Sequence, residues 1–259
     1  MSKVCLILGA GAGIGLAVAK RFSAEGYHIC LVRRSNQAGL DRAVQELSTN
    51  GQKASGYILD VTLPDQLELL IKKIENEIGA IHTAVYNVGA QIGDRSLDDT
   101  SLKVFELGWK LGTLGLFRVA KTLIPYMVSR SSGNLLVTGA TASVRGNGGQ
   151  HSHAATMAAR RMLCQSLNAE FASKGVHVAH IVIDGLVDAP DTLGKMLGPD
   201  AFEDLKQRKG YEKNGLLLPE KIADSYFHLA HQHPSAWTHE LDLRPHSALA
   251  WWNHQKLDL

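Results

Sequence analysis

The sequence contains few cysteines. There are three in 259 residues, Cys5, Cys30 and Cys164, an odd number of widely separated thiols. Cys5 and Cys30 stand within apolar, strand-like runs, where a free thiol behaves as a small buried hydrophobe. This pattern does not indicate a disulfide framework and favours a reducing, intracellular setting. We therefore expect a cytoplasmic protein.

Long apolar runs and a strong charge of one sign are also missing. No uninterrupted apolar stretch approaches the ~20 residues that a membrane-spanning helix needs. The run that begins at Val4 breaks into glycines after Leu8, so a strand and a turn explain it better than a signal peptide. The formal net charge is +2, without a basic cluster that would follow a phosphate backbone. We expect neither a membrane protein nor a nucleic-acid-binding protein.

Short aliphatic runs alternate with longer amphipathic stretches along the whole chain. Strand-like runs begin at Val4, His28, Ala54, Ile81, Asn134 and Val176, and a last one lies within Trp237–Pro245. Such alternation implies right-handed crossovers and a mostly parallel sheet. The fold class predicted is α/β, a Rossmann-type doubly wound parallel sheet of about seven strands with helices on both faces.

The stretches between the strands carry recognisable helix ends. Thr62 is a candidate N-cap for a helix with Pro64 in its first turn and Gly79 after its end. Residues 48–51 and 173–175 resemble helix stops. Pro125 falls in a long helical segment at about 101–128, which we expect it to kink or end.

We expect one domain over residues 1–259, with an excursion from the core at about 189–218. This excursion carries proline, glycine and mixed charge without strand-like runs. Its apolar residues are consistent with an apolar substrate pocket, and equally with ordinary helix packing; they are Leu193, Met196, Leu197 and Phe202.

A glycine-rich turn, "LGAGAGIG" at Leu8–Gly15, follows the first strand and opens a helix. Gly9 permits a tight turn, Gly13 lets the backbone approach a pyrophosphate, and Gly15 lets helix and strand pack closely. The helix N-terminus then offers free N–H groups and a positive dipole to phosphates. The pattern predicts a dinucleotide site.

This glycine spacing matches the TGxxxGIG pattern of the short-chain dehydrogenase/reductase family, with Leu8 in the Thr place. "LDVT" at Leu59–Thr62 resembles the Asp-Val pair that borders the adenine in that family. "YNVGA" at 86–90 is similar to its NNAG motif. The resemblance runs over nearly the whole chain, and the cofactor-binding residues it implies are Gly9, Gly11, Gly13, Ile14, Gly15, Asp60, Val61, Asn87, Gly89 and Gly185.

Two arginines, Arg33 and Arg34, stand at the end of the second strand. NAD-binding folds carry an acidic residue here, which holds the ribose hydroxyls. A guanidinium can instead bind a 2′-phosphate with paired hydrogen bonds. The pair favours NADP(H) over NAD(H); the alternative is two solvated surface arginines.

The catalytic set of the family is changed at every place. The family uses a Tyr, a Lys four residues later, a Ser and an Asn; aligned to those patterns, this chain has Gly112 for Asn, Ala140 for Ser, His153 for Tyr and Met157 for Lys. No tyrosine occurs between Met127 and Tyr211. "TGATASVRG" from Thr138 resembles a divergent branch of the family. The nicotinamide-cradling PGxxxT reads "DGLVDA", with Asp184 for Pro and Ala189 for Thr.

Candidates for a substitute proton donor are His153, at the Tyr place, and Ser143, as a hydroxyl partner. An imidazole moves protons near neutral pH; the alternative is that His153 is only a polar residue at the mouth of a cleft. His228, His231 and His233 lack the cysteine or carboxylate spacing of a metal site, so we expect a solvated helix end and no metal.

Three functions remain open. The first is an NADP(H)-dependent oxidoreductase on a carbonyl or alcohol substrate, with His153 or water as proton source. The second is a catalytically inactive NADP(H)-binding sensor or structural partner, and the third is non-redox chemistry in the same cleft. Trp251 and Trp252 would be covered at a subunit interface or over the protein's own cleft. The family resemblance implies a homodimer or homotetramer.

Overall fold

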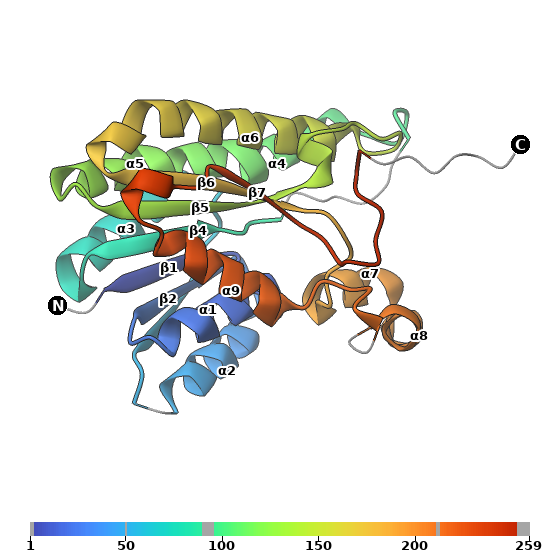
Figure 1. Cartoon of the computed structure of the whole chain (residues 1–259), viewed down its shortest axis with the longest axis horizontal. Helices are drawn as coiled ribbons and strands as arrows, with labels where there is room; N and C mark the ends of the chain where they lie inside the picture. The colour runs from blue at the N-terminus through green and yellow to red at the C-terminus, as the bar shows by residue number, and fades with distance from the viewer. Residues whose placement is uncertain (1–2, 50, 90–95, 211–212, 253–259) are drawn as a thin grey trace, which may run out of the picture.

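The computed structural model describes residues 3–49, 51–89, 96–210 and 213–252. Seven strands form one parallel sheet in the order β3-β2-β1-β4-β5-β6-β7 (Figure 1). This confirms the predicted fold class, and the strands start at or within one residue of six predicted positions. Their bounds are β1 Val4–Leu8, β2 His28–Arg33, β3 Ala54–Ile58, β4 Ile81–Tyr86, β5 Gly133–Ala140, β6 Val176–Ile183 and β7 Glu240–Leu243.

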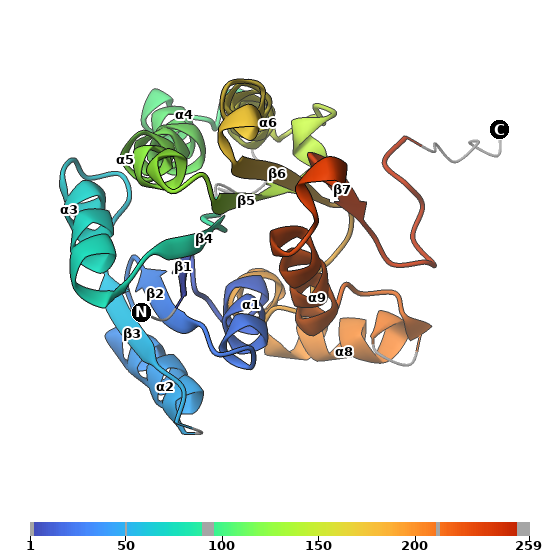
Figure 2. The same ribbon diagram turned by 60° about the vertical axis from the view of Figure 1, so that its left-hand side comes forward.

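Helices cover both faces of the sheet (Figures 1 and 2). One face carries α3 (Gln66–Lys73), α4 (Leu102–Trp109), α5 (Gly115–Ser129) and α6 (His151–Phe171). The other carries α1 (Ile14–Ser23), α2 (Gln37–Ser48) and α9 (Pro219–Ala230). The excursion holds α7 (Lys195–Leu197) and α8 (Pro199–Lys209), which lie beyond one end of the sheet.

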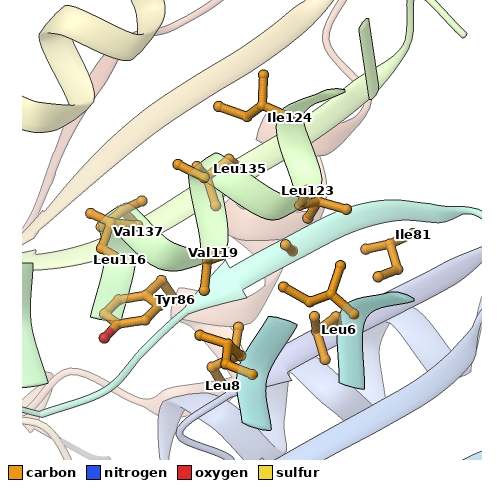
Figure 3. Packing of buried hydrophobic residues seen from close by; sticks show 14 of the residues in the cluster. Leu6, Leu8, Ile81, Tyr86, Leu116, Val119, Leu123, Ile124, Leu135 and Val137 are labelled. Carbon is orange, nitrogen blue, oxygen red and sulfur yellow. The ribbon is translucent and has the colours of Figure 1, made fainter. Parts of the chain in front are cut away.

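The central strand β1 belongs to two hydrophobic cores. Leu6 and Leu8 pack toward α3 and α5, together with Tyr86 and Val119 (Figure 3). Cys5, as predicted, is buried, and faces the layer formed by α1, α2 and α9. A strand buried on both faces reads as a continuous apolar run, which is why the strands were visible in the sequence. Each such aliphatic side chain contributes roughly 1.5–3 kcal/mol by leaving water.

Helices α1 and α9 pack side by side although about 200 residues separate them in the chain. The Phe22 ring of α1 lies edge-on to the Phe227 ring of α9, with centroids 5.1 Å apart. The Arg21 guanidinium stacks over the same Phe227 ring at 3.9 Å. Through these contacts α9 covers α1.

One predicted helix start was wrong, and Pro125 does not end its helix. Helix α3 starts at Gln66, after Asp65, and not at Thr62, whose backbone N–H instead donates to the Asp60 side chain at 2.9 Å. Asp60 thereby forms a turn that delays the helix. Pro125 lies inside α5, which continues to Ser129. The helical segment is interrupted earlier, by a π-helical turn at Lys110–Leu114. In this turn the Leu111 carbonyl oxygen accepts a hydrogen bond from the Tyr86 hydroxyl.

The strand order reverses between β1 and β4, since β2 and β3 extend to one side of β1 and β4 to β7 to the other. In doubly wound sheets this switch point leaves a crevice at the carboxyl ends of the strands, where ligands bind. The glycine-rich turn after β1 and the segment after β4 border this crevice.

Candidate functional site

The glycine-rich turn leaves β1 in a conformation that only glycine adopts easily. Gly9 has φ +89° and Gly13 has φ +154°. A side chain at Gly9 would place its Cβ 2.7 Å from the carbonyl carbon of Asn87, and one at Gly15 would stand 2.9 Å from Cα of Ala10. Helix α1 then begins at Ile14 and directs its N-terminus toward the turn. The expected tight turn and close helix packing are both present.

Asn87 supports this turn from β4. Its Nδ2 donates to the Gly9 carbonyl at 2.9 Å, and its Oδ1 accepts a hydrogen bond from the Thr138 hydroxyl at 2.9 Å. Thr138 in turn lies 2.7 Å from the buried Tyr226 hydroxyl of α9. Burial raises the pKa of Tyr226, so this phenol stays protonated at neutral pH. Asn87, predicted as a cofactor contact, therefore positions the turn through its side chain.

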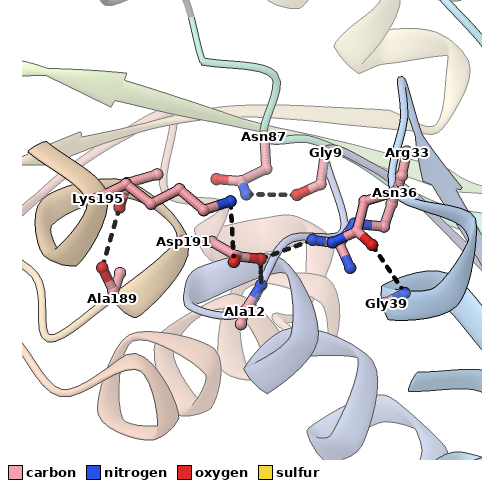
Figure 4. Close-up of polar contacts among 10 residues, drawn as sticks. Gly9, Ala12, Arg33, Asn36, Gly39, Asn87, Ala189, Asp191 and Lys195 are labelled. Carbon is pink, nitrogen blue, oxygen red and sulfur yellow. Dashed lines mark hydrogen bonds and ion pairs between the residues drawn. The ribbon is translucent and has the colours of Figure 1, made fainter. Parts of the chain in front are cut away.

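An ion pair lies against the same turn (Figure 4). Arg33, at the end of β2, donates from Nη2 to Oδ2 of Asp191 at 2.6 Å, and its side chain is 12% exposed. The same Oδ2 accepts the backbone N–H of Ala12 at 2.8 Å, and Lys195 Nζ lies 3.3 Å from Oδ1. The turn thus holds a carboxylate with a backbone N–H and a guanidinium, which shows that its donor set fits an anionic oxygen.

Partial burial of Asp191 works against its charge. The N–H of Ala12 and the cations Lys195 and Arg33 outweigh that effect and hold the pKa of the Asp191 carboxyl below its usual value. Asp191 is therefore a carboxylate at neutral pH. Sequence reasoning missed this residue because 158 positions separate it from Arg33.

The other predicted cofactor residues are distributed around the crevice. Arg34 is exposed, beside Arg33. Arg118 of α5 donates to the carbonyl of Val61 at 3.2 Å and steadies the segment after β3. Gly89 follows β4, and a Cβ there would meet no described atom within 4 Å; the next residue, Ala90, lies outside the described residues. Gly11 lies in the turn, and Ile14 is the first residue of α1.

Gly185 lies in contact with the C-terminal segment. A Cβ there would stand 2.8 Å from Cδ of Pro245. The preceding Asp184 accepts the backbone N–H of Trp251 at 3.0 Å, and the Trp251 carbonyl accepts Arg145 at 3.0 Å. Trp252 is 53% exposed. Within the described residues, the tail therefore packs against the loop after β6.

The four places aligned with the catalytic set gather around the start of α6. The π-helical turn with Gly112, the end of β5 with Ala140, and the first turns of α6 pack against one another. Met157 is 3% exposed and packs with Ala140, Ala142 and Ala154. His153 is partly exposed on the same helix, and the buried Ser143 donates its hydroxyl to the Ala140 carbonyl at 2.7 Å.

A buried arginine lies behind these places. Arg160 of α6 is 1% exposed and donates to three carbonyl oxygens, those of Gly112 at 2.9 Å, Thr138 at 2.7 Å and Val88 at 2.9 Å. Among the described residues its hydrogen-bond partners are carbonyls and not carboxylates. Burial lowers the pKa of Arg160, but a guanidinium stays charged at neutral pH. It joins the segments after β4, in β5 and before α5.

The excursion forms a small core of its own. Leu193, Leu205 and Leu216 are buried together with Phe202 packed against them, whereas Met196 is 60% exposed. Leu193 and Phe202 are therefore used in packing within the excursion, and Met196 and Leu197 remain at its surface.

The sequence matches the short chain dehydrogenase family over residues 3–193. The chain belongs to the short-chain dehydrogenase family. An uncharacterized oxidoreductase of Staphylococcus epidermidis is 28% identical over 243 residues, which cover 94% of this chain and 97% of the relative. The 3-oxoacyl-(acyl-carrier-protein) reductase FabG of Thermotoga maritima is 28% identical over 194 residues, covering 73% of this chain and 76% of the relative.

Solved structures agree with this membership. A short-chain dehydrogenase from Rhodopseudomonas palustris has a TM-score of 0.78 at 27% identity, with 94% of this chain and 99% of that chain covered. The L-sorbose reductase of Gluconobacter frateurii, complexed with NADPH and L-sorbose, has a TM-score of 0.81 at 23% identity, with 96% and 98% covered, and shows the shared fold. The predicted short-chain dehydrogenase resemblance is thereby confirmed.

The described residues offer neither a metal-binding cluster nor a membrane-spanning helix. They contain no group of three or more His, Cys, Asp or Glu arranged to hold a metal ion. Across the described helices, none is long and apolar enough to span a membrane. His231, one of the three clustered histidines, bonds instead to the Tyr27 hydroxyl at 3.0 Å.

Proposed function

We propose that this protein is an NADP(H)-dependent oxidoreductase acting on a carbonyl or alcohol substrate. The observation that supports it most is the place of Arg33, whose largely buried guanidinium lies at the end of β2 and beside the glycine-rich turn. A guanidinium there suits a 2′-phosphate, and the acidic residue that would favour NAD(H) is missing. Similar solved structures include complexes with NADPH and NADP.

The residues that would hold the cofactor follow from the crevice. The turn Gly9–Gly15 and the N-terminus of α1 would bind the pyrophosphate, and Arg33 the 2′-phosphate. Asp60 and Val61 would border the adenine. When bound, the cofactor supplies or accepts the hydride, and the protein orients it.

The proton would come from His153. It lies in the first turn of α6, a helix that packs against the end of β5 and against the 3-10 turn Thr141–Ser143. An imidazole at this place can donate a proton to a carbonyl oxygen, or accept one from an alcohol. Met157, at the place of the family's lysine, packs with Ala140 and Ala142 and has no charge to offer a proton donor.

A first test is the affinity for each cofactor. We expect calorimetric titration to show at least about tenfold tighter binding of NADPH than of NADH, since a guanidinium–phosphate pair contributes on the order of 1.5–3 kcal/mol. Arg33→Ser should remove this preference. Arg34→Ser, at the exposed neighbour, is the control and should retain most of it. Equal binding of both cofactors by the native protein would contradict the NADP(H) assignment.

A second test is turnover by His153→Ala. We expect about a hundredfold loss of kcat in NADPH oxidation with a panel of aldehydes and ketones, because general acid catalysis contributes roughly 10²–10⁴. NADPH affinity should not change. The exposed His151→Ala is the matched control and should keep its activity. If His153→Ala turns over like the native protein, the proton has another source.

The second candidate is an NADP(H)-binding protein without turnover. The buried contact of Met157 with Ala140 and Ala142 favours it, because apolar side chains fill two of the four places that the family uses for catalysis. It requires tight NADPH binding by the native protein and no NADPH oxidation with any member of the carbonyl panel.

A further inference from the structure

The carboxylate of Asp191 lies where a nucleotide phosphate would bind. It takes the backbone N–H of Ala12, in the glycine-rich turn, and the guanidinium of Arg33. Both groups are donors that the proposed function assigns to the cofactor. The Asp191 carboxylate thus occupies two protein donors at once, one assigned to the pyrophosphate and one assigned to the 2′-phosphate.

The surrounding excursion is packed against the turn. Cβ of Ala189 lies 2.9 Å from the place a Cβ would take at Gly13, and Asp191 approaches within 3.5 Å of the corresponding place at Gly11. A Cβ at Gly13 would force the segment to shift, whereas one at Gly11 would make an ordinary contact with Asp191. The turn's open side, which must face a pyrophosphate, is therefore covered by residues 189–191.

Charge also opposes coexistence of the two anions. A phosphate at the turn would lie next to the Asp191 carboxylate in a partly buried place. Two neighbouring negative charges that are poorly solvated repel each other strongly. Binding of a dinucleotide requires Asp191 to leave, and its ion pairs with Arg33 and Lys195 to break.

We propose that Asp191 is an autoinhibitory latch, which closes the phosphate site of the free protein and competes with the nucleotide for Ala12 and Arg33. This inference rests on the proposed nucleotide site. The latch belongs to the excursion, whose small core of Leu193, Leu205 and Leu216 is separate from the two cores of the sheet, so we expect it to move as a unit. Its release would leave Lys195 and Asp191 free to contact solvent or the substrate side.

The latch predicts how the affinities for NADPH and NADH change relative to each other. Opening reduces the apparent affinity of every ligand that needs the open turn by the same fraction. Removing the latch must therefore tighten NADPH and NADH equally, while their ratio, set by Arg33, stays the same. A residue that merely recognised one cofactor would change the ratio.

The test is Asp191→Asn, which keeps the side-chain shape and removes its charge. We expect calorimetry to give about tenfold tighter binding of NADPH, of NADH and of inorganic pyrophosphate than in the native protein, a change of about 1.4 kcal/mol. Asp200→Asn is the matched control, since it removes the same charge from an exposed position in the excursion. It should bind all three like the native protein.

The outcomes separate the latch from the proposed function. Unchanged affinities in Asp191→Asn, with native NADPH binding intact, would overturn the latch and leave the function standing. Tighter pyrophosphate binding in Asp191→Asn, without NADPH binding by either protein, would support the latch and overturn the NADP(H) function. If neither protein binds pyrophosphate or NADPH, both proposals fall.

Discussion

Replacing Arg160 by methionine should destabilise the protein by about 3 kcal/mol or more, because buried carbonyl oxygens would lose their charged hydrogen-bond donor. The guanidinium donates to the carbonyl oxygens of Gly112, Thr138 and Val88, and a methionine side chain has no hydrogen-bond donor to replace it. Equilibrium unfolding in urea measures the loss. The three segments it joins also form the wall of the proposed active site, so we expect their relative positions to loosen.

Arg161→Met is the control for this prediction, since it changes the next residue of the same helix. Arg161 makes a paired contact with Glu240 at 2.6 and 2.8 Å, but its side chain is 28% exposed. A solvated pair of this kind contributes about 1 kcal/mol or less. If both variants lose the same free energy of unfolding, the burial of Arg160 is not what makes it important.

Replacing Gly9 by alanine should abolish NADPH binding and destabilise the fold by several kcal/mol. Two costs add: a left-handed φ of +89°, and a Cβ 2.7 Å from the carbonyl carbon of Asn87. The second contact is with backbone, which cannot rotate away. The turn must shift, and with it the N-terminus of α1 that would bind the pyrophosphate. Thermal unfolding and an NADPH titration measure the two effects.

Gly26→Ala separates strain from collision. Gly26 has a similar φ of +79°, but a Cβ there would meet no atom of the described residues within 4 Å. It should lose only the roughly 1 kcal/mol of left-handed strain and bind NADPH normally. Gly9→Ala that bound NADPH like Gly26→Ala would show that the turn after β1 does not hold the cofactor.

The strands and the glycine turn were predictable because their causes are local. β1 and the centre of β2, Ile29–Val32, are continuous apolar runs, since parallel strands are buried on both faces. The start of the helix at Gln66 was predicted too early because the Asp60 side chain, outside the helix, accepts the N–H of Thr62. Turn chemistry of this kind competes with capping and is not visible from residue types alone.

The contacts of Asp191 and Arg160 were not predictable. Asp191 reads in sequence as one more acidic residue in a loop, and only the fold brings it to Arg33. Arg160 reads as one of two adjacent helical arginines, yet one is buried and the other partly exposed. Their roles depend on which carbonyls and carboxylates the tertiary structure places nearby.

The pairing of α1 with α9 bears on the order in which the chain can fold during synthesis. Val18, Ala19 and Phe22 are buried in a layer that α9 completes. A nascent chain that has not yet reached Pro219 leaves these side chains facing water, although its first strands are already made. Such surfaces attract chaperones and other unfinished chains. Almost the whole sequence must therefore be synthesised before the apolar side chains of α1 are fully buried.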